Sequence, residues 1–376
     1  METKNKRNSS VELLRIFSMF LIVAYHAVPQ ISSRLSGGNI PADTTNILLG
    51  SWGILGVDIF VIISAWFLCG RQLKASRLIN VTLTVFVWYV IYFIEQFVIF
   101  FRKERSLAVA AKNCIRCLLD DFFNPFWAKC FWFVTAYFFM LLLSPFLNAI
   151  LSKDRKTVKK ILIFTAFIPI YSQFANSPVC DIVYFLYVFL LTGYIKLYLG
   201  QILEKFSKVY FAAAVTFIIA LSRFAIPYLS GSWLKRTVCT VITNTVGSVN
   251  RHSVIILLDA LLIFGTAVYS KPFYSKIING ISARMFGVYL FHENKSVLML
   301  PGNIALITEF AINRDLLSYN RFYPFSLALL VLTVMLLGTA ADFIIDKCAV
   351  IPLSNIINKK LSKKLKTFEA YVNNTE

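Results

Sequence analysis

The feature of this sequence that most constrains its fold is a succession of long apolar stretches. A helix needs about 20 mainly apolar residues to cross the hydrocarbon core of a bilayer. Ten segments come close to this requirement, at roughly residues 11–30, 48–69, 78–101, 130–151, 158–175, 179–200, 209–230, 253–271, 279–300 and 323–346. Hydrophobic residues make up 58% of the chain and charged residues 15%, against about 45–50% and about 25% in soluble domains. We therefore predict an all-α, polytopic membrane bundle of about ten transmembrane helices. The composition argues against a soluble enzyme, a disordered regulator or a disulfide scaffold.

The basic residues indicate how this bundle is oriented. The formal net charge is +19, from 38 Lys and Arg against 19 Asp and Glu. In a soluble protein such an excess suggests nucleic-acid binding, but here the basic residues lie mostly in short runs between apolar segments, as in cytoplasmic loops. More than half of them fall on one side when the N-terminus is placed inside. We expect both termini in the cytoplasm, membrane lipids as neighbours and no nucleic-acid partner.

Segments outside the spans complete the predicted organisation. The stretch from Leu107 to Phe123 reads as an amphipathic helix lying at the interface. We assign residues 1–346 to a transmembrane domain and residues 347–376 to a basic cytoplasmic tail. The tail is rich in lysine, and we expect a solvated segment attracted to anionic lipid. The seven cysteines are scattered and odd in number, so they predict no disulfide framework, and we expect no metal.

The first apolar span carries the most informative ionisable residues, because charges inside a bilayer are costly and mark functional sites. Glu12 lies three residues before Arg15 and can pair with it on one helix face. Arg15 and His26 are eleven positions apart, which places them on one stripe about 16 Å apart along the axis. The alternative is a purely structural role, with Arg15 reaching the interface and His26 packed and hydrogen-bonded.

The second span and the loop after it contain a further set. Gly53 and Gly56 allow a neighbouring helix to approach closely. Asp58 is a carboxylate within an apolar run, and we expect an Arg or His on a neighbouring span as its partner. The basic residues Arg71, Lys74 and Arg77 follow just inside the membrane. They suffice as an ordinary orientation signal, and they also suit a phosphorylated cofactor.

Two later spans add aromatic and histidine candidates. Trp132 and Tyr137 begin the fourth span, where Trp132 is expected to anchor the helix at the interface. Tyr289 and His292 in the ninth span are three residues apart and share a face.

Taken together, these residues resemble acyltransferase family 3, bacterial multispanning enzymes that move acyl groups, usually acetyl, onto sugars of surface polysaccharides and lipid-linked glycans. Five motifs in the same order carry the resemblance over nearly the whole chain. They are Arg15 to His26 with Glu12 before them, Gly56 to Trp66, Lys74-x-x-Arg77, Trp132 to Tyr137, and Tyr289 to His292. Two positions depart from the family pattern, because Ala65 stands in place of a glycine and Lys74 in place of an arginine.

The resemblance implies an acetyl-CoA donor that arrives from the cytoplasm of a bacterial cell, and a protein of the plasma membrane. Arg15, Arg77 and Lys74 would hold its phosphates or its pantetheine arm, with Lys74 less suited because a lysine cannot bind phosphate in a bidentate way. His26 would deprotonate a sugar hydroxyl or relay the acetyl group itself.

The resemblance also implies which residues face the acceptor and which additional domain is expected to be absent. Six residues are expected on the substrate side: Asp58, Ser64, Trp132, Tyr137, Tyr289 and His292. His292 could orient the acceptor, pair with Asp58, or only pack. Some family members carry an additional hydrolase-like domain after the last span, and we expect this protein to act without one. The sequence does not specify the oligomeric state.

Two other functional classes remain open from the sequence. Ten spans with intramembrane charges also fit a secondary transporter or a flippase for a glycan or small anion. Such folds are built from inverted repeats, and no repeat is visible. A membrane scaffold would explain the hydropathy but not the stripe that carries Arg15 and His26.

Overall fold

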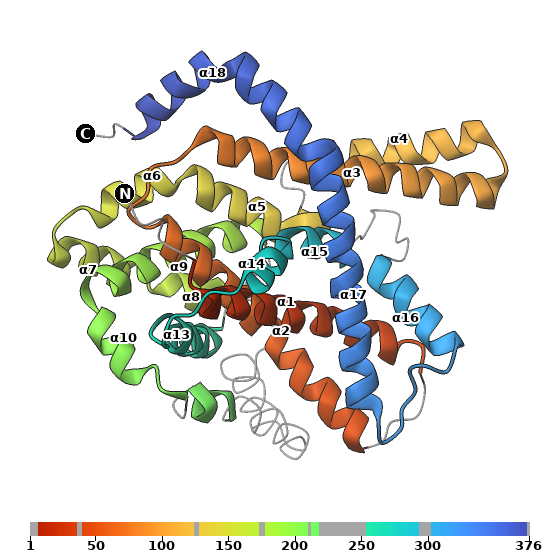
Figure 1. Ribbon diagram of the computed structural model, residues 1–376, viewed down its shortest axis with the longest axis horizontal. Coiled ribbons are helices and arrows are strands. Elements are labelled where there is room, and N and C mark those ends of the chain that lie inside the picture. Colours follow the sequence, from red (N-terminus) through yellow and green to blue (C-terminus); the bar gives the residue numbers. More distant parts are fainter. Residues whose placement is uncertain are drawn as a thin grey trace.

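The computed structural model of the chain describes residues 7–35, 40–123, 128–172, 177–209, 212–217, 253–292 and 302–373, and these ranges contain helices but no strand. The helices, drawn in Figure 1, are α1 (Ser9–Ser32), α2 (Ile40–Leu68), α3 (Ala75–Glu104), α4 (Leu107–Phe123), α5 (Ala128–Leu142), α6 (Ser144–Leu151), α7 (Arg155–Phe164), α8 (Phe167–Ser172), α9 (Pro178–Tyr198), α10 (Gly200–Phe206), α13 (Val254–Val268), α14 (Lys276–Ser282), α15 (Met285–His292), α16 (Asn303–Asn313), α17 (Tyr323–Ile345), the π-helical turn η1 (Asp346–Val350) and α18 (Ile351–Asn373). The predicted all-α class is confirmed for this part of the chain.

Helices α1 and α2 pack against each other at the centre of the bundle, where α1 also touches α13, α14, α15, α16 and α17 (Figure 1). Their close approach depends on two glycines, as predicted. A Cβ atom at Gly56 would meet the carbonyl oxygen of Ser18, and one at Gly53 would meet the ring of Tyr25. Small residues let helix backbones approach closely where two apolar helices meet. The contact fixes the helix that carries Glu12, Arg15 and His26.

Several helices have the length and apolar character of membrane spans. Within the described ranges, four qualify, namely Ser9–Ser32, Ala75–Glu104, Val179–Tyr198 and Tyr323–Asn373. Trp132–Leu142 and Ser144–Leu151 qualify together as one span bent by 54°. The bend coincides with Pro145, which cannot donate a helical hydrogen bond. Trp52–Leu68 and Val254–Val268 are shorter apolar helices. The described part of the chain therefore contains helices suited to a membrane bundle, and the predicted number of ten spans stays a prediction.

Two predicted spans are interrupted in the structure. In the span predicted at 158–175, α7 ends at Phe164 and α8 begins at Phe167. In the span predicted at 279–300, α14 ends at Ser282 and α15 runs only from Met285 to His292. Residues 293–301 and most of the predicted span 209–230 lie outside the described residues. Hydropathy averaged over a window of about 19 residues does not locate breaks this short.

The two outlying segments are helical. The predicted interfacial helix is confirmed as a helix, since α4 covers Leu107–Phe123 and packs beside α3. The tail is helical and mostly exposed: η1 joins α17 to α18, and α18 packs against α3. Polar side chains of α18 make this contact, as described below.

Candidate functional site

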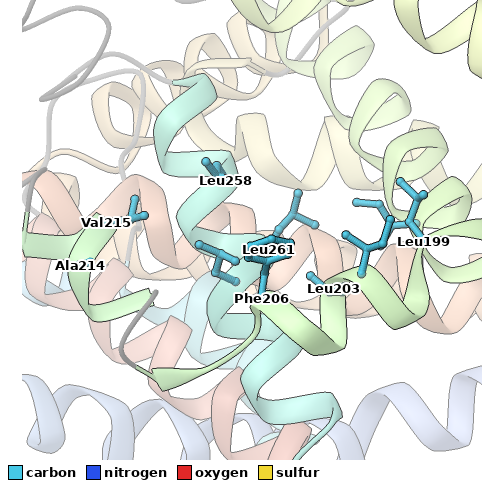
Figure 2. Close-up of a pocket in the computed structure, with 10 residues that line it drawn as sticks. Leu199, Leu203, Phe206, Ala214, Val215, Leu258 and Leu261 are labelled. Atoms are coloured by element: carbon cyan, nitrogen blue, oxygen red, sulfur yellow. The ribbon is translucent and has the colours of Figure 1, made fainter.

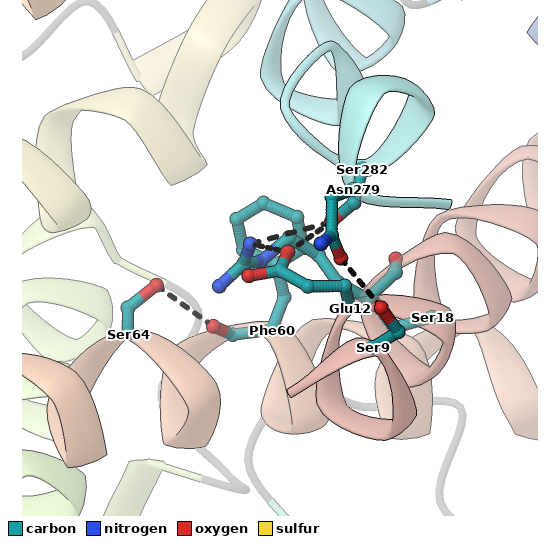
Figure 3. A network of polar contacts seen from close by, with 8 residues as sticks. Ser9, Glu12, Ser18, Phe60, Ser64, Asn279 and Ser282 are labelled. Carbon is teal, nitrogen blue, oxygen red and sulfur yellow. Dashed lines mark hydrogen bonds and ion pairs between the residues drawn. The ribbon is translucent and has the colours of Figure 1, made fainter. Parts of the chain in front are cut away.

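The first polar cluster forms where the start of α1 meets α14, and we call Glu12, Arg15 and Ser282 the cation site. The Arg15 guanidinium donates a hydrogen bond to the Glu12 carboxylate and another, at 3.3 Å, to the Ser282 hydroxyl oxygen. Ser282 in turn donates to Glu12. The side chains of Arg15 and Glu12 are only 18% and 7% exposed. Figure 3 shows Glu12, Ser282 and their neighbours converging from the two helices. The predicted pairing of Glu12 with Arg15 is confirmed.

A second contact holds α14 against the first turn of α1. The Ser9 hydroxyl donates to Asn279 Oδ1 at 2.9 Å (Figure 3). It also accepts from the Ser275 backbone N–H at 2.7 Å. Ser9 is fully buried, so these bonds satisfy a polar group that would be costly to leave unpaired. The arrangement fixes Ser282 relative to Arg15.

Tyr137 on α5 connects the cation site to α2 and α3. The Tyr137 side chain lies within electrostatic reach of both Arg15 and Arg77 and interacts with the Ser64 side chain. Two of the three predicted donor-binding residues thus interact electrostatically with one tyrosine. Lys74 differs from them, because its side chain is exposed at the start of α3 and makes no capping hydrogen bond.

The loop that leads to Arg77 is held at its beginning. Gly70 has φ of 77°, the left-handed conformation with which a glycine commonly ends a helix. Asn148 on α6 accepts from the Gly70 backbone N–H at 3.0 Å and donates to the carbonyl oxygens of Leu68 and Arg71. The basic segment after α2 is therefore fixed to the bundle.

The second polar cluster is the two-histidine site, formed by His26 on α1 and His292 on α15. Their ring centroids are 5.2 Å apart in an edge-to-face arrangement. Tyr25 packs edge-on against His26 at 5.1 Å, and Tyr289 packs against His292 at 5.6 Å. His292 Nδ1 lies 3.1 Å from the carbonyl oxygen of Val288. Because a carbonyl only accepts, this contact requires the proton on Nδ1 and leaves Nε2 as the acceptor of a neutral ring.

The short helix α15 is fastened at both ends, which fixes His292. Before it, Arg284 forms ion pairs with Asp342 on α17, at 3.3 Å, and with Asp346 in η1. At its far end, the Tyr92 hydroxyl donates to the Leu290 carbonyl oxygen, and Asn303 Nδ2 donates to the Phe291 carbonyl oxygen at 3.0 Å. These bonds satisfy carbonyl groups that a helix end leaves without partners.

The ion pairs of Arg284 explain why the predicted span 279–300 is broken. Ala283 and Arg284 form a turn between α14 and α15, and from it the guanidinium reaches two carboxylates. In the sequence, Arg284 is only a basic residue within a predicted apolar span, which does not indicate its partners. The signal that could have found its role is Asp342, an acidic residue inside the last predicted span.

Asp58 has a different partner from the one expected. It is fully buried, and the Tyr184 hydroxyl on α9 lies 3.2 Å from both of its carboxylate oxygens. The expected Arg or His partner is therefore wrong, because the hydrogen-bond partner of Asp58 is Tyr184. A tyrosine in an apolar span gives little signal because its ring suits the bilayer.

The remaining aromatic candidates form a chain of ring contacts between the two polar clusters. Phe133 stacks on Tyr137 with centroids 6.0 Å apart and packs against Tyr289 at 5.2 Å. Trp132 is half-buried and packs on Phe133 and Phe185. From Tyr137 through Phe133 and Tyr289, the chain reaches His292 and then His26.

An apolar cavity lies apart from these clusters. It has a volume of about 370 Å³ and is lined by side chains of α9, α10 and α13, together with Ala214 and Val215 (Figure 2). Every lining residue is apolar, so the cavity offers no group for acid–base chemistry. In the described part of the chain, no group of three His, Cys, Asp or Glu side chains is placed to hold a metal ion.

The chain was compared with known proteins. Residues 8–345 match the family model described as an acyltransferase domain. No curated protein and no solved structure matches the chain.

Proposed function

Because the chain belongs to the acyltransferase domain family that residues 8–345 match, we propose that it moves an acetyl group from cytoplasmic acetyl-CoA to a sugar hydroxyl of a cell-surface or lipid-linked glycan. The family and the apolar helices make it a membrane acyltransferase. The donor, the acceptor and the bacterial plasma membrane are our proposals. The observation that supports them is the pair of neighbouring imidazoles, His26 and His292. His26 lies on the same helix, α1, as the largely buried Arg15.

The cation site and Arg77 suit the donor. The Arg15 and Arg77 guanidinium groups, on α1 and α3, both interact electrostatically with Tyr137, and guanidinium groups bind phosphate oxygens by paired hydrogen bonds. Arg15 is positioned by Glu12 and Ser282, so its orientation is set before any donor arrives. Lys74 adds positive charge at the start of α3, but its exposed side chain is not held in one orientation as Arg15 is.

His26 is the proposed general base. A neutral imidazole nitrogen takes the proton of the acceptor hydroxyl, and the oxygen attacks the thioester carbonyl carbon. The carbon–sulfur bond then breaks, and the CoA thiolate leaves and takes the proton from the imidazolium. A sugar hydroxyl needs this base because it is a poor nucleophile when protonated. His292 and Tyr289 position the His26 ring and the acceptor.

The separation of the two sites suits a long donor. Arg15 and His26 lie on one helix about 16 Å apart, and the ring contacts from Tyr137 to Tyr289 connect the two regions. A phosphate bound near Arg15 and Arg77 would leave the flexible pantetheine arm to reach His26. Of the remaining substrate-side candidates, Ser64 lies beside Tyr137 at the donor end. Trp132 packs against Phe133 in the chain of ring contacts. Asp58 is held by Tyr184, which favours a role in positioning α2.

A transfer assay with a matched pair of variants tests the donor assignment. Membranes that contain the protein are incubated with labelled acetyl-CoA, and label is expected on the glycan fraction. Replacing Arg77 by Gln removes charge-assisted phosphate contacts worth about 1.5–3 kcal/mol, so KM for acetyl-CoA should rise about 10- to 100-fold. Arg71→Gln is the control, because Arg71 is exposed six residues earlier.

Each outcome of this assay has a definite meaning. Transport of acetylated glycan without label transfer would favour the transporter or flippase. Label on the protein in the absence of acceptor would favour an acyl-enzyme relay over direct transfer. Equal KM values for Arg77→Gln and Arg71→Gln would contradict the donor site.

A further inference from the structure

Helix α18 lies beyond the part of the chain that matches the family. The match ends at residue 345, and α17 continues through η1 into α18 as one helical stretch, Tyr323–Asn373. Figure 1 shows α18 arching away from the top of α17 and returning beside the first part of α3. The match to the family therefore does not include this helix.

Both ends of the arch are attached to the start of α3. Near its beginning, the Ser354 hydroxyl donates to Asn80 Oδ1. Near its end, Glu369 Oε1 accepts from the Ala75 backbone N–H at 2.6 Å. Asn373 both accepts from the Leu73 backbone N–H at 2.9 Å and donates to the Leu73 carbonyl oxygen at 3.0 Å.

These bonds supply the cap that α3 otherwise lacks. Lys74 occupies the N-cap position, and its side chain accepts no backbone hydrogen bond. A carboxylate at this position satisfies a free N–H group and interacts favourably with the helix dipole. Arg77 lies in the first turn of α3, so the docking of α18 fixes the backbone that positions Arg77.

The rest of α18 has the chemistry of a membrane-surface helix. Between the attached ends, its middle carries five exposed lysines, Lys359, Lys360, Lys363, Lys364 and Lys366. Leu353, Leu361 and Phe368 on the same helix are also exposed, at 39%, 40% and 37% respectively. Lysines beside an exposed apolar stripe are typical of helices that lie on an anionic bilayer surface.

We propose that α18 binds the anionic bilayer surface and that this binding holds the start of α3, and with it Arg77, in the arrangement that accepts the donor. The apolar stripe enters the interface while the lysines contact the phosphate groups of the lipids. When the anionic lipid is absent, the repulsion among the five lysines is not offset, and the Glu369 and Asn373 contacts open more often. The dependence of the donor on α18 rests on the proposed function, whereas lipid binding and docking do not.

Hydrogen exchange on the whole protein tests the docking directly. The protein is reconstituted in nanodiscs of phosphatidylcholine alone or of phosphatidylcholine mixed with phosphatidylglycerol. Exchange is followed in peptides that contain the Leu73 and Ala75 amides, which donate to α18. We expect exchange about tenfold slower in the anionic nanodiscs. KM for acetyl-CoA should be lower there, with kcat at saturating donor unchanged.

Two variants with equal charge loss separate α18 from a general surface effect. In the first, the five lysines of α18 are replaced by Gln, and the lipid dependence of exchange and of KM should disappear. In the second, the exposed residues Lys153, Arg155, Lys156, Lys159 and Lys160 around α7 are replaced by Gln, and both dependences should remain. Equal exchange of the unmodified protein in the two lipids would overturn the proposal, as would loss of the dependence in the α7 variant.

The two readouts also distinguish this proposal from the proposed function. If no acetyl transfer occurs in any lipid but exchange still depends on anionic lipid and on the α18 lysines, the proposed function fails and the docking of α18 stands. If transfer occurs but hydrogen exchange and KM are the same in both lipid compositions, the proposal for α18 is contradicted and the proposed function stands.

Discussion

The ion pair of the cation site yields the sharpest prediction, because its contributions to stability and to transfer can be separated. Glu12→Gln removes the counter-charge of Arg15 while keeping the shape of the side chain. Breaking one partner of a buried pair costs about 3–5 kcal/mol. Arg15 retains 18% side-chain exposure and its hydrogen bond to Ser282, so we expect a loss of about 2–3 kcal/mol in the free energy of unfolding. The assay is denaturant titration of purified protein in mixed micelles.

A second substitution reverses the stability loss without restoring function. In Glu12→Gln/Arg15→Met no buried charge remains without a partner, and apolar replacement of a buried pair is often neutral. The double variant should unfold within about 1 kcal/mol of the unmodified protein. It should show no acetyl transfer, because Arg15 is gone from the donor site.

An exposed ion pair provides the control. Arg34 and Glu309 lie 3.7 Å apart with side chains 26% and 52% exposed, and exposed pairs contribute about 0–1 kcal/mol. Glu309→Gln should therefore change stability by less than about 1 kcal/mol. If Glu12→Gln were as mild as Glu309→Gln, the cation site would not be buried. If the double variant transferred acetyl groups normally, Arg15 would not bind the donor.

Two further predictions concern the helix that carries Asp58. Gly56→Ala places a methyl group against the carbonyl oxygen of Ser18 and should destabilise the protein by about 1–3 kcal/mol. The control is Gly280→Ala, which meets nothing within 4 Å and should be neutral or stabilising. Equal stabilities of the two variants in a denaturant titration would contradict the close contact of α1 and α2. Tyr184→Phe removes the hydroxyl beside the Asp58 carboxylate and should cost about 1–3 kcal/mol in the same titration, and an unchanged midpoint would refute their coupling.

Local spacing predicted the features that lie within one helix. Glu12 and Arg15 are three residues apart, and their pairing in α1 follows from helix geometry alone. The close approach at Gly56 and the helix over Leu107–Phe123 were likewise readable from the sequence. In each case the interaction depends on neighbours along the chain or on the absence of a side chain.

Contacts between distant helices could not be predicted in this way. His26 and His292 meet because α1 and α15 cross, and no spacing rule relates positions so far apart. The sequence also gave no reason to choose Tyr184 over a charged partner for Asp58. The break before α15 depends on Arg284 reaching Asp342 and Asp346 on another helix.

The tail shows a different reason why a contact could not be predicted. Its many lysines dominate the composition and suggested a solvated segment. The docking is made instead by Glu369 and Asn373, four residues apart on one helix face. The net charge of the tail does not indicate which individual residues form hydrogen bonds, so it could not predict this contact.

The most direct test of the account is acetyl transfer by purified His26→Ala protein in nanodiscs, with labelled acetyl-CoA and the glycan acceptor. Loss of a general base typically lowers the rate by about 10²–10⁴-fold. We predict a loss of this size with unchanged unfolding stability and unchanged insertion in the membrane. Near-normal transfer by His26→Ala would contradict the account at its centre.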